Sequence, residues 1–319
     1  MGGDFSETVL ATSSWVVCSI GMMVFNKLAV RDFPLECSLV VLQMLVTVVI
    51  ILVVRWNHLH IGSTRDLARW LRVVPFFSGV LLSSMFALSR APMSLVIVFR
   101  GLAPIFSLLA ERFYPEPLKV NQPMLCTLFA LLGGVFMYIY DVPLKNNLGG
   151  IVFVLLNNFF VVGDRLLQRL MLGRDQAPVD ISKESVTIIN NSFGTIPLLI
   201  VAVFLGEPAK IPMAVQSLDV FGWLWIVLSC LVGVGIAYTG IWTQSLITAT
   251  SFLVLACSNK FFVLLIEVFI IGSKVLAPKQ FLGAIVTIVA GVWYGKVRQE
   301  AERKSTQLGE TTRLNRQIV

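Results

Sequence analysis

The chain has 319 residues, of which 56% are hydrophobic and only 13% are charged, and its mean hydropathy is +0.83. This number of charged residues is too small to cover the apolar core of a soluble protein. The composition therefore excludes a soluble protein and predicts one with several membrane spans. The formal net charge of +7 would suit a nucleic-acid-binding protein, but the positions of the Lys and Arg residues favour another explanation.

Ten apolar runs approach the length that a membrane-spanning helix needs, which is about 20 residues. Clusters of polar residues, Gly or Pro separate these runs. The predicted spans are 9–30, 37–54, 71–89, 92–113, 122–140, 147–170, 184–205, 218–239, 247–271 and 277–295. The chain is therefore predicted to be an all-α membrane protein with one transmembrane domain, residues 1–298. Residues 299–319 would form a polar cytosolic tail, which we expect to be solvated and partly disordered.

The Lys and Arg residues are distributed unevenly between the two sides of these spans. Counting residues at the ends of spans with the adjoining loop, sixteen of the 25 lie in the loops after spans 2, 4 and 6 and in the tail, six lie in the opposite loops, and three lie inside spans. Because cytosolic loops are enriched in Lys and Arg, this distribution predicts that both termini are cytosolic. The basic excess is thus explained by membrane topology, without a nucleic-acid partner.

Two of the three intramembrane cations lie in the first half of the chain. Arg100 interrupts the apolar run SLVIVFRGLAPIFSLLA, where a charge costs from about 3 to more than 10 kcal/mol and must face water or a partner. Gly101 and Pro104 follow it, which favours a locally irregular helix that lines a cavity. An ion pair that locks a gate is the alternative. Lys27 lies near the end of the first span, where snorkelling to the interface explains it more simply than ligand contact.

Two asparagine pairs follow, Asn157-Asn158 in the sixth span and Asn190-Asn191 in the seventh. Adjacent carboxamides offer several donors and acceptors at once, as recognition of a planar group such as a nucleobase requires. Hydrogen bonds between helices, worth about 1 kcal/mol or less each, explain the same residues equally well.

The ninth span carries the third intramembrane cation, in the sequence SFLVLACSNKFFVLLIEVFII. Ser258, Asn259 and Lys260 are consecutive, and Ala256 lies one turn before the lysine on the same face. A small residue there leaves space for a ligand beside the ammonium group. A structural ion pair, with Glu267 or with an acid from another span, is the alternative.

Neither enzymatic nor metal chemistry is indicated. The five cysteines lie in or beside spans without the paired spacing of a metal site or a disulfide framework. The chain contains neither HExxH nor the GxxxxGK[ST] phosphate loop. The sequence therefore predicts a protein that is not an enzyme, with no metal and no cofactor.

An internal repeat is visible at a shift of 157 residues. This shift places LLGGVFMY (131–138) on the segment around Gly291 and Trp293, and it also places Ser94 on Ser251. Two copies of five spans, about 9–140 and 147–296, would insert in opposite orientations because five is odd, as in the inverted repeats of secondary transporters. The alternative is coincidence, since apolar helices rich in Leu, Val and Gly always align to some extent.

Several short motifs carry a family resemblance. The INN of the seventh span, the NN of the sixth, TATS (248–251) and ACSNK (256–260) resemble the nucleotide-sugar transporters of the drug/metabolite transporter superfamily. Within that group the chain is most similar to the GDP-mannose transporter branch, whose signatures are FYNN and GALNK. Residues 188–191 keep the two asparagines of the first signature, and residues 256–260 keep the final Asn-Lys of the second. The likeness in hydropathy extends over residues 9–298.

The resemblance implies roles for particular residues. Asn190 and Asn191 would contact the nucleobase, Asn259 and Lys260 would meet the sugar or diphosphate end, and Tyr238 of the AYTG stretch would line the site. Together with the remaining intramembrane polar residues, the candidate binding set is Lys27, Arg100, Asn190, Asn191, Tyr238, Ser258, Asn259 and Lys260.

The resemblance also implies a mechanism and a location. Such a carrier is an antiporter that exchanges a cytosolic nucleotide sugar, GDP-mannose-like or a UDP-sugar, for a lumenal nucleoside monophosphate. We expect the Golgi membrane, with the endoplasmic reticulum or a plastid membrane as alternatives, and the resemblance allows a homodimer. An exchanger of phosphorylated metabolites, like the triose-phosphate translocators, is the alternative function, and a nucleobase pocket would distinguish the two.

Overall fold

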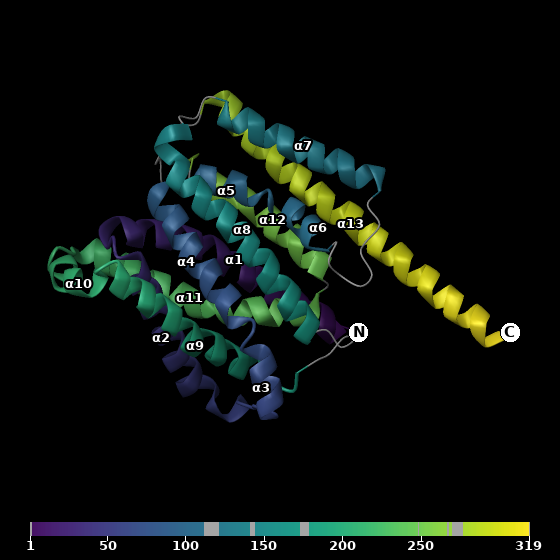
Figure 1. Cartoon of the computed structure of the whole chain (residues 1–319), viewed down its shortest axis with the longest axis horizontal. Helices are drawn as coiled ribbons and strands as arrows, with labels where there is room; N and C mark the ends of the chain where they lie inside the picture. Colours follow the sequence, from purple (N-terminus) through teal and green to yellow (C-terminus); the bar gives the residue numbers. More distant parts are fainter. Residues whose placement is uncertain are drawn as a thin grey trace.

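The computed structural model describes residues 2–111, 121–140, 144–172, 179–247, 249–266, 268–269 and 277–318. Regular structure in these residues is helical, and their only β-type pairing is an isolated antiparallel bridge between Ile61 and Ile181. The helices form one elongated bundle with a long helix projecting from it (Figure 1). The prediction of an all-α protein is confirmed.

The helices of the first half of the chain are α1 (Gly2–Asp32), α2 (Glu36–Arg55), α3 (Thr64–Trp70), α4 (Val74–Arg90), α5 (Met93–Arg100), α6 (Ala103–Glu111) and α7 (Gln122–Ile139), with a 3₁₀ turn at Trp56–His58. Those of the second half are α8 (Leu144–Leu172), α9 (Lys183–Phe204), α10 (Glu207–Gln216), α11 (Val220–Leu246), α12 (Ala249–Ile266) and α13 (Pro278–Ile318).

Each predicted span overlaps one helix, or two in the case of the fourth. Among the described residues, eight helical segments are long and apolar enough to cross a membrane, which confirms the membrane class. The fourth and ninth predicted spans correspond to shorter apolar segments, Met93–Leu109 and Leu255–Ile266. These two segments carry Arg100 and Lys260, and the count of ten spans stays a prediction.

Antiparallel helix pairs build the bundle, and two of the pairs pack through glycines. α1 packs along α11, and α4 packs along α8. In both pairs, residues further along one helix meet residues earlier in the other: Cys18 meets Gly235 and Gly21 meets Val232, while Phe76 meets Gly163 and Gly79 meets Phe160. A glycine at each contact lets the helices approach closely, as small residues do in membrane bundles.

A third antiparallel pair, α2 with α9, is held at both of its ends. At one end, which we call the Glu207 end, the buried carboxylate of Glu207 accepts hydrogen bonds from the backbone N–H groups of Cys37 (3.1 Å) and Ser38 (2.7 Å). A carboxylate there satisfies the free donors at the start of α2 and complements the helix dipole. At the other, the Arg55 end, Arg55 lies 3.9 Å from Glu184.

The fourth pair, α7 with α13, lies side by side along one edge of the bundle (Figure 1). Gly134 lies so close to α13 that a Cβ atom there would be 2.6 Å from the backbone N of Thr287. The neighbouring Gly133 faces away, and a Cβ atom there would meet nothing within 4 Å. Close packing of these helices therefore depends on one of two adjacent glycines.

The tail differs from the expectation of partial disorder. α13 continues without a break to Ile318 and projects far beyond the bundle (Figure 1). Residues 299–318 contain several Glu, Gln, Arg and Lys residues, which are good helix formers, and the membrane-spanning part of α13 provides a preformed helix end to extend.

The two glycines provide a matched test of this packing. Gly134→Ala should lower the midpoint of thermal unfolding, because α13 must shift to accept the methyl group and such overpacking costs about 1–3 kcal/mol. Gly133→Ala should leave the midpoint almost unchanged. The measurement is thermal unfolding of both purified variants in detergent, and equal midpoints would contradict the packing of α7 on α13.

Candidate transport pathway

A helix break lies within the fourth predicted span, as Gly101 and Pro104 led us to expect. α5 ends at Arg100 and α6 begins at Ala103. In a continuous helix the N–H of residue 104 would bond to the carbonyl of residue 100, but proline has no N–H. The carbonyl oxygen of Arg100 is therefore left without its helical donor.

Side chains from other helices donate to the carbonyls at this break. The ammonium of Lys260, on α12, donates a hydrogen bond of 3.0 Å to the carbonyl of Arg100. Asn158, on α8, donates one of 2.8 Å to the carbonyl of Phe99. The partial negative charge at the end of α5 thus compensates part of the cost of burying the ammonium group.

Arg100 itself adds a second cation at the same break. Its guanidinium donates a hydrogen bond to the hydroxyl of Ser84 on α4. Within the described ranges, neither Arg100 nor Lys260 forms an ion pair with a carboxylate. Glu267, the acid considered as a partner for Lys260, lies outside the described residues. The two cations are therefore held by neutral groups, which leaves their charges available to an anion.

Two buried polar atoms of Arg100 and of Asn259, which precedes Lys260, have no hydrogen-bond partner among the residues that the structure describes: the Nε of Arg100 and the Oδ1 of Asn259. Asn259 is only 4% exposed, and its amide nitrogen donates 2.7 Å to the hydroxyl of Ser19 on α1. Ser258, the preceding residue, is partly buried. An unpartnered donor on Arg100, and an unpartnered acceptor on the residue next to Lys260 in α12, favour a ligand that offers an anionic oxygen and a hydroxyl group.

The predicted asparagine pair of α9 is buried and already bonded within the protein. The Oδ1 of Asn190 accepts a hydrogen bond of 2.9 Å from the indole N–H of Trp70, which is fully buried. The amide nitrogen of Asn191 donates 2.8 Å to the carbonyl of Thr187, one turn earlier in the same helix. Asn190 thus connects α9 to α3, whereas this hydrogen bond of Asn191 is local to its own helix.

Lys27 and Tyr238 lie apart from the helix break. The ammonium of Lys27 donates hydrogen bonds to the carbonyls of Leu88 (2.5 Å) and Ala91 (2.8 Å), where it caps the end of α4. The hydroxyl of Tyr238 accepts a hydrogen bond of 2.6 Å from Arg55 and lines a cavity of about 540 Å³ at the Arg55 end.

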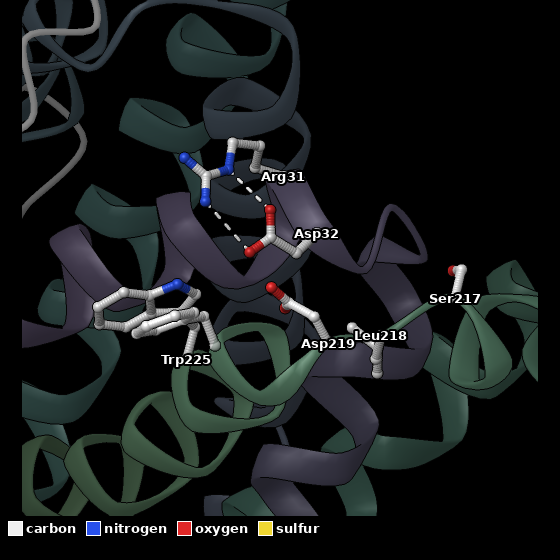
Figure 2. Close-up of a pocket in the computed structure, with 7 residues that line it drawn as sticks. Arg31, Asp32, Ser217, Leu218, Asp219 and Trp225 are labelled. Carbon is white, nitrogen blue, oxygen red and sulfur yellow. Dashed lines mark hydrogen bonds and ion pairs between the residues drawn. The ribbon is translucent and has the colours of Figure 1, made fainter.

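A second cavity, of about 520 Å³, lies at the opposite end of the α1–α11 pair. Figure 2 shows the carboxylates of Asp32 and Asp219 on the same side of it, with Arg31 bound to Asp32 and Trp225 along one wall. Two carboxylates against one guanidinium make this cavity unsuitable for an anion.

Several residues at these sites were not among the predicted set: Ser84, Asn158, Arg55 and Ser19. Asn158 belonged to a pair that the sequence singled out, and Arg55 marks the end of a span. Ser19 and Ser84 carry no signal in a single sequence, because serine is common in membrane helices and only packing places Ser84 beside Arg100 and Ser19 beside Asn259.

Relatives of known name match most of the chain. The nucleotide sugar transporter SLC35D2 of Homo sapiens is 23% identical over 308 residues, which cover 95% of this chain and 89% of the relative. GDP-fucose transporter 1 of Arabidopsis thaliana is 25% identical and covers 98% of this chain and 96% of the relative. The GDP-mannose transporter GONST1 of Arabidopsis thaliana is 21% identical, with coverage of 80% and 78%. No family model matches the chain.

The resemblance to nucleotide-sugar transporters is thereby confirmed, at low identity. These relatives are named as transporters and not as enzymes, which supports the interpretation of a non-enzyme. A solved crystal structure also matches, with a TM-score of 0.56 and 15% identity over 91% of this chain and 98% of that chain. At this identity the structural match shows a shared fold.

The two asparagines of α9 should differ in their effect on stability. Asn190→Leu leaves the buried indole N–H of Trp70 without an acceptor, which should cost about 1–3 kcal/mol. Asn191→Leu should cost less, because the carbonyl of Thr187 can still accept the helical N–H of residue 191. Thermal unfolding of the two variants tests this order, and a larger loss for Asn191→Leu would contradict it.

Proposed function

We propose that this chain is a nucleotide-sugar transporter that works as an alternating-access antiporter. It exchanges a cytosolic nucleotide sugar for a lumenal nucleoside monophosphate. The observation that carries the proposal is the pair of cations at the α5–α6 break, Arg100 and Lys260, together with the unpartnered Nε of Arg100 and Oδ1 of Asn259. These groups fit the part of a nucleotide sugar where the diphosphate meets the sugar.

The chemistry of the substrate matches this centre. A diphosphate needs fixed positive charge, and each cation is worth far more in a low-dielectric interior than in water. The Nε of Arg100 and the ammonium of Lys260 would bind phosphate oxygens, and Asn259 would accept a hydrogen bond from a sugar hydroxyl. Two of the relatives are named for GDP-sugars, which favours a guanosine nucleotide over a uridine one.

The helix contacts support the inverted repeat that such a mechanism uses. When the spanning helices of the two predicted halves are paired in chain order, α1 corresponds to α8 and α4 to α11, so the α1–α11 contact has its counterpart in the α4–α8 contact. The pairs α2–α9 and α7–α13 each join two corresponding helices, and both are antiparallel. Two such halves can rock about a site near the midplane.

Exchange, as opposed to one-way transport, follows from the charges. An empty carrier must reorient with two cations whose described partners are neutral, whereas a bound phosphate compensates them. Both nucleotide sugar and nucleoside monophosphate supply that phosphate. We propose the Golgi membrane, which the resemblance to nucleotide-sugar transporters implies, with both termini cytosolic, which the distribution of Lys and Arg predicts.

One observation favours a second candidate, exchange of phosphorylated metabolites without a base. Asn190 and Asn191, the residues proposed to read the base, bond to Trp70 and Thr187 inside the protein. The cations at the helix break would bind a sugar phosphate equally well.

Lys260 provides the test of the binding centre. Lys260→Ala should abolish nucleotide-sugar uptake into liposomes while the protein still inserts and remains monodisperse. Lys260→Arg should restore uptake only partly, because the guanidinium is wider and planar. Lys210, exposed on α10, provides the control, and Lys210→Ala should transport normally. Near-normal uptake by Lys260→Ala would exclude the assignment.

Asn191 separates the two candidate functions. If it bonds to a base, Asn191→Ala should weaken competition by nucleoside monophosphates about five- to 150-fold, the equivalent of about 1–3 kcal/mol, and should hardly change competition by simple sugar phosphates. If competition by both ligand classes weakened equally, the role of Asn190 and Asn191 would be to hold helices together. A wild-type protein that ignores nucleotides would assign the function to metabolite exchange.

A further inference from the structure

The cavity at the Arg55 end combines cations with aromatic rings. It lies between the ends of α2 and α11 and the starts of α1 and α9, and Arg55, Lys183, Tyr238 and Trp242 line it. The rings of Tyr238 and Trp242 are neighbours, with centroids 6.3 Å apart. The cavity has a volume of about 540 Å³ and opens widely to the surface.

Arg55 connects the two halves of the chain at this cavity. From α2 it donates a hydrogen bond of 2.6 Å to the hydroxyl of Tyr238, and its guanidinium carbon lies 5.4 Å from the centre of that ring. It also lies 3.9 Å from a carboxylate oxygen of Glu184 on α9. Next to it, the indole N–H of Trp242 donates 3.0 Å to Glu7 on α1.

The contacts of Arg55 with Tyr238 and Glu184 are weak enough for an incoming anion to replace them. Its side chain is 39% exposed, and the separation from Glu184 lies at the outer limit of an ion pair, so water screens the attraction. A phosphate group binds a guanidinium through two parallel, charge-assisted hydrogen bonds, which are stronger than a bond to a neutral hydroxyl.

We propose that this cavity is a capture site for the phosphate group of a nucleotide, separate from the centre at Lys260. Arg55 releases Tyr238 and Glu184 and binds the phosphate oxygens instead, and Lys183 adds a second positive charge. The rings of Tyr238 and Trp242 then offer faces on which a base stacks. Because Arg55 joins α2 to α9 and α11, the exchange also loosens the contact between the halves at this end. That the ligand is a nucleotide rests on the proposed function. That the cavity binds a phosphate group does not depend on it.

The other end of the α1–α11 pair provides an internal comparison. The cavity at Asp32 and Asp219 has a similar volume, about 520 Å³, and an aromatic wall, but it carries two carboxylates and one guanidinium (Figure 2). The cavity at the Arg55 end balances two carboxylates, Glu7 and Glu184, with two cations. The cavity at Asp32 and Asp219 thus starts with a net negative charge, whereas the cavity at the Arg55 end starts neutral and repels an incoming phosphate less.

The test measures binding of labelled pyrophosphate by the full-length chain in lipid-free detergent. All variants are made in a protein that also carries Lys260→Ala, which impairs the centre at the helix break. Lys260→Gln replaces Lys260→Ala if that protein is unstable. Both should retain saturable pyrophosphate binding. Adding Arg55→Ala should weaken this binding at least about tenfold, and Arg55→Lys should weaken it less.

Two further variants distinguish competition for Arg55 from a structural role. Tyr238→Phe and Glu184→Gln each remove a group that competes with phosphate for the guanidinium. Each should therefore tighten pyrophosphate binding, by about two- to tenfold. Loss of a merely structural contact would not increase affinity. Unchanged binding in Arg55→Ala, or weaker binding in both competitor variants, would overturn the proposal.

Controls separate the capture site from its alternatives. Arg72, exposed on the same end and outside the cavity lining, should be replaceable by Ala without effect. Displacement of pyrophosphate by phosphatidic acid at equal concentration would assign the cavity to lipid headgroups and contradict the proposal. Failure of the wild type to transport nucleotide sugars would contradict the proposed function but would leave these binding results in place, so the two failures are distinguishable.

Discussion

A proline sets the position of the central cation. Pro104 lacks the N–H that would occupy the carbonyl of Arg100, and Lys260, which lies on α12, donates to that carbonyl instead. A buried ammonium group would otherwise be too costly inside a membrane, and a continuous helix would offer it no carbonyl. The break therefore both places Arg100 and Lys260 together and makes their burial tolerable. Among the described residues, the Nε of Arg100 and the Oδ1 of Asn259 have no partner, and the proposed substrate would supply one for each.

The antiparallel helix pairs around this centre differ in how firmly they are held together. Glycine contacts hold α1 against α11 and α4 against α8, and Gly134 holds α7 against α13. The α2–α9 pair is held at the Glu207 end by a buried carboxylate and at the Arg55 end by contacts that water reaches. The Arg55 end is therefore the weaker of the two, because exposed ion pairs contribute little and buried, charge-assisted hydrogen bonds contribute more. A rocking motion would begin at the weaker end.

The sequence predicted features that depend on local chemistry. Hydropathy located the apolar helices of the bundle but not the short helices α3 and α10. Gly101 with Pro104 predicted the irregularity at Arg100, because proline acts on its own helix. Hydropathy could not give the partner of Lys260, which is a carbonyl 160 residues earlier in the chain. The same holds for the bond between Asn190 and Trp70, which depends on how α3 packs against α9. The tail was misjudged because its polar composition says little about a helix that continues from a membrane span.

The central claim is that the cations at the helix break make the protein an exchanger of nucleotide sugars. The most direct measurement uses purified protein in liposomes that are either preloaded with guanosine monophosphate or left empty, and then offered labelled GDP-mannose. Uptake into the preloaded liposomes should be rapid and uptake into the empty ones slight, because the empty carrier reorients poorly. Equal uptake into both, or exchange that only simple sugar phosphates support, would contradict it.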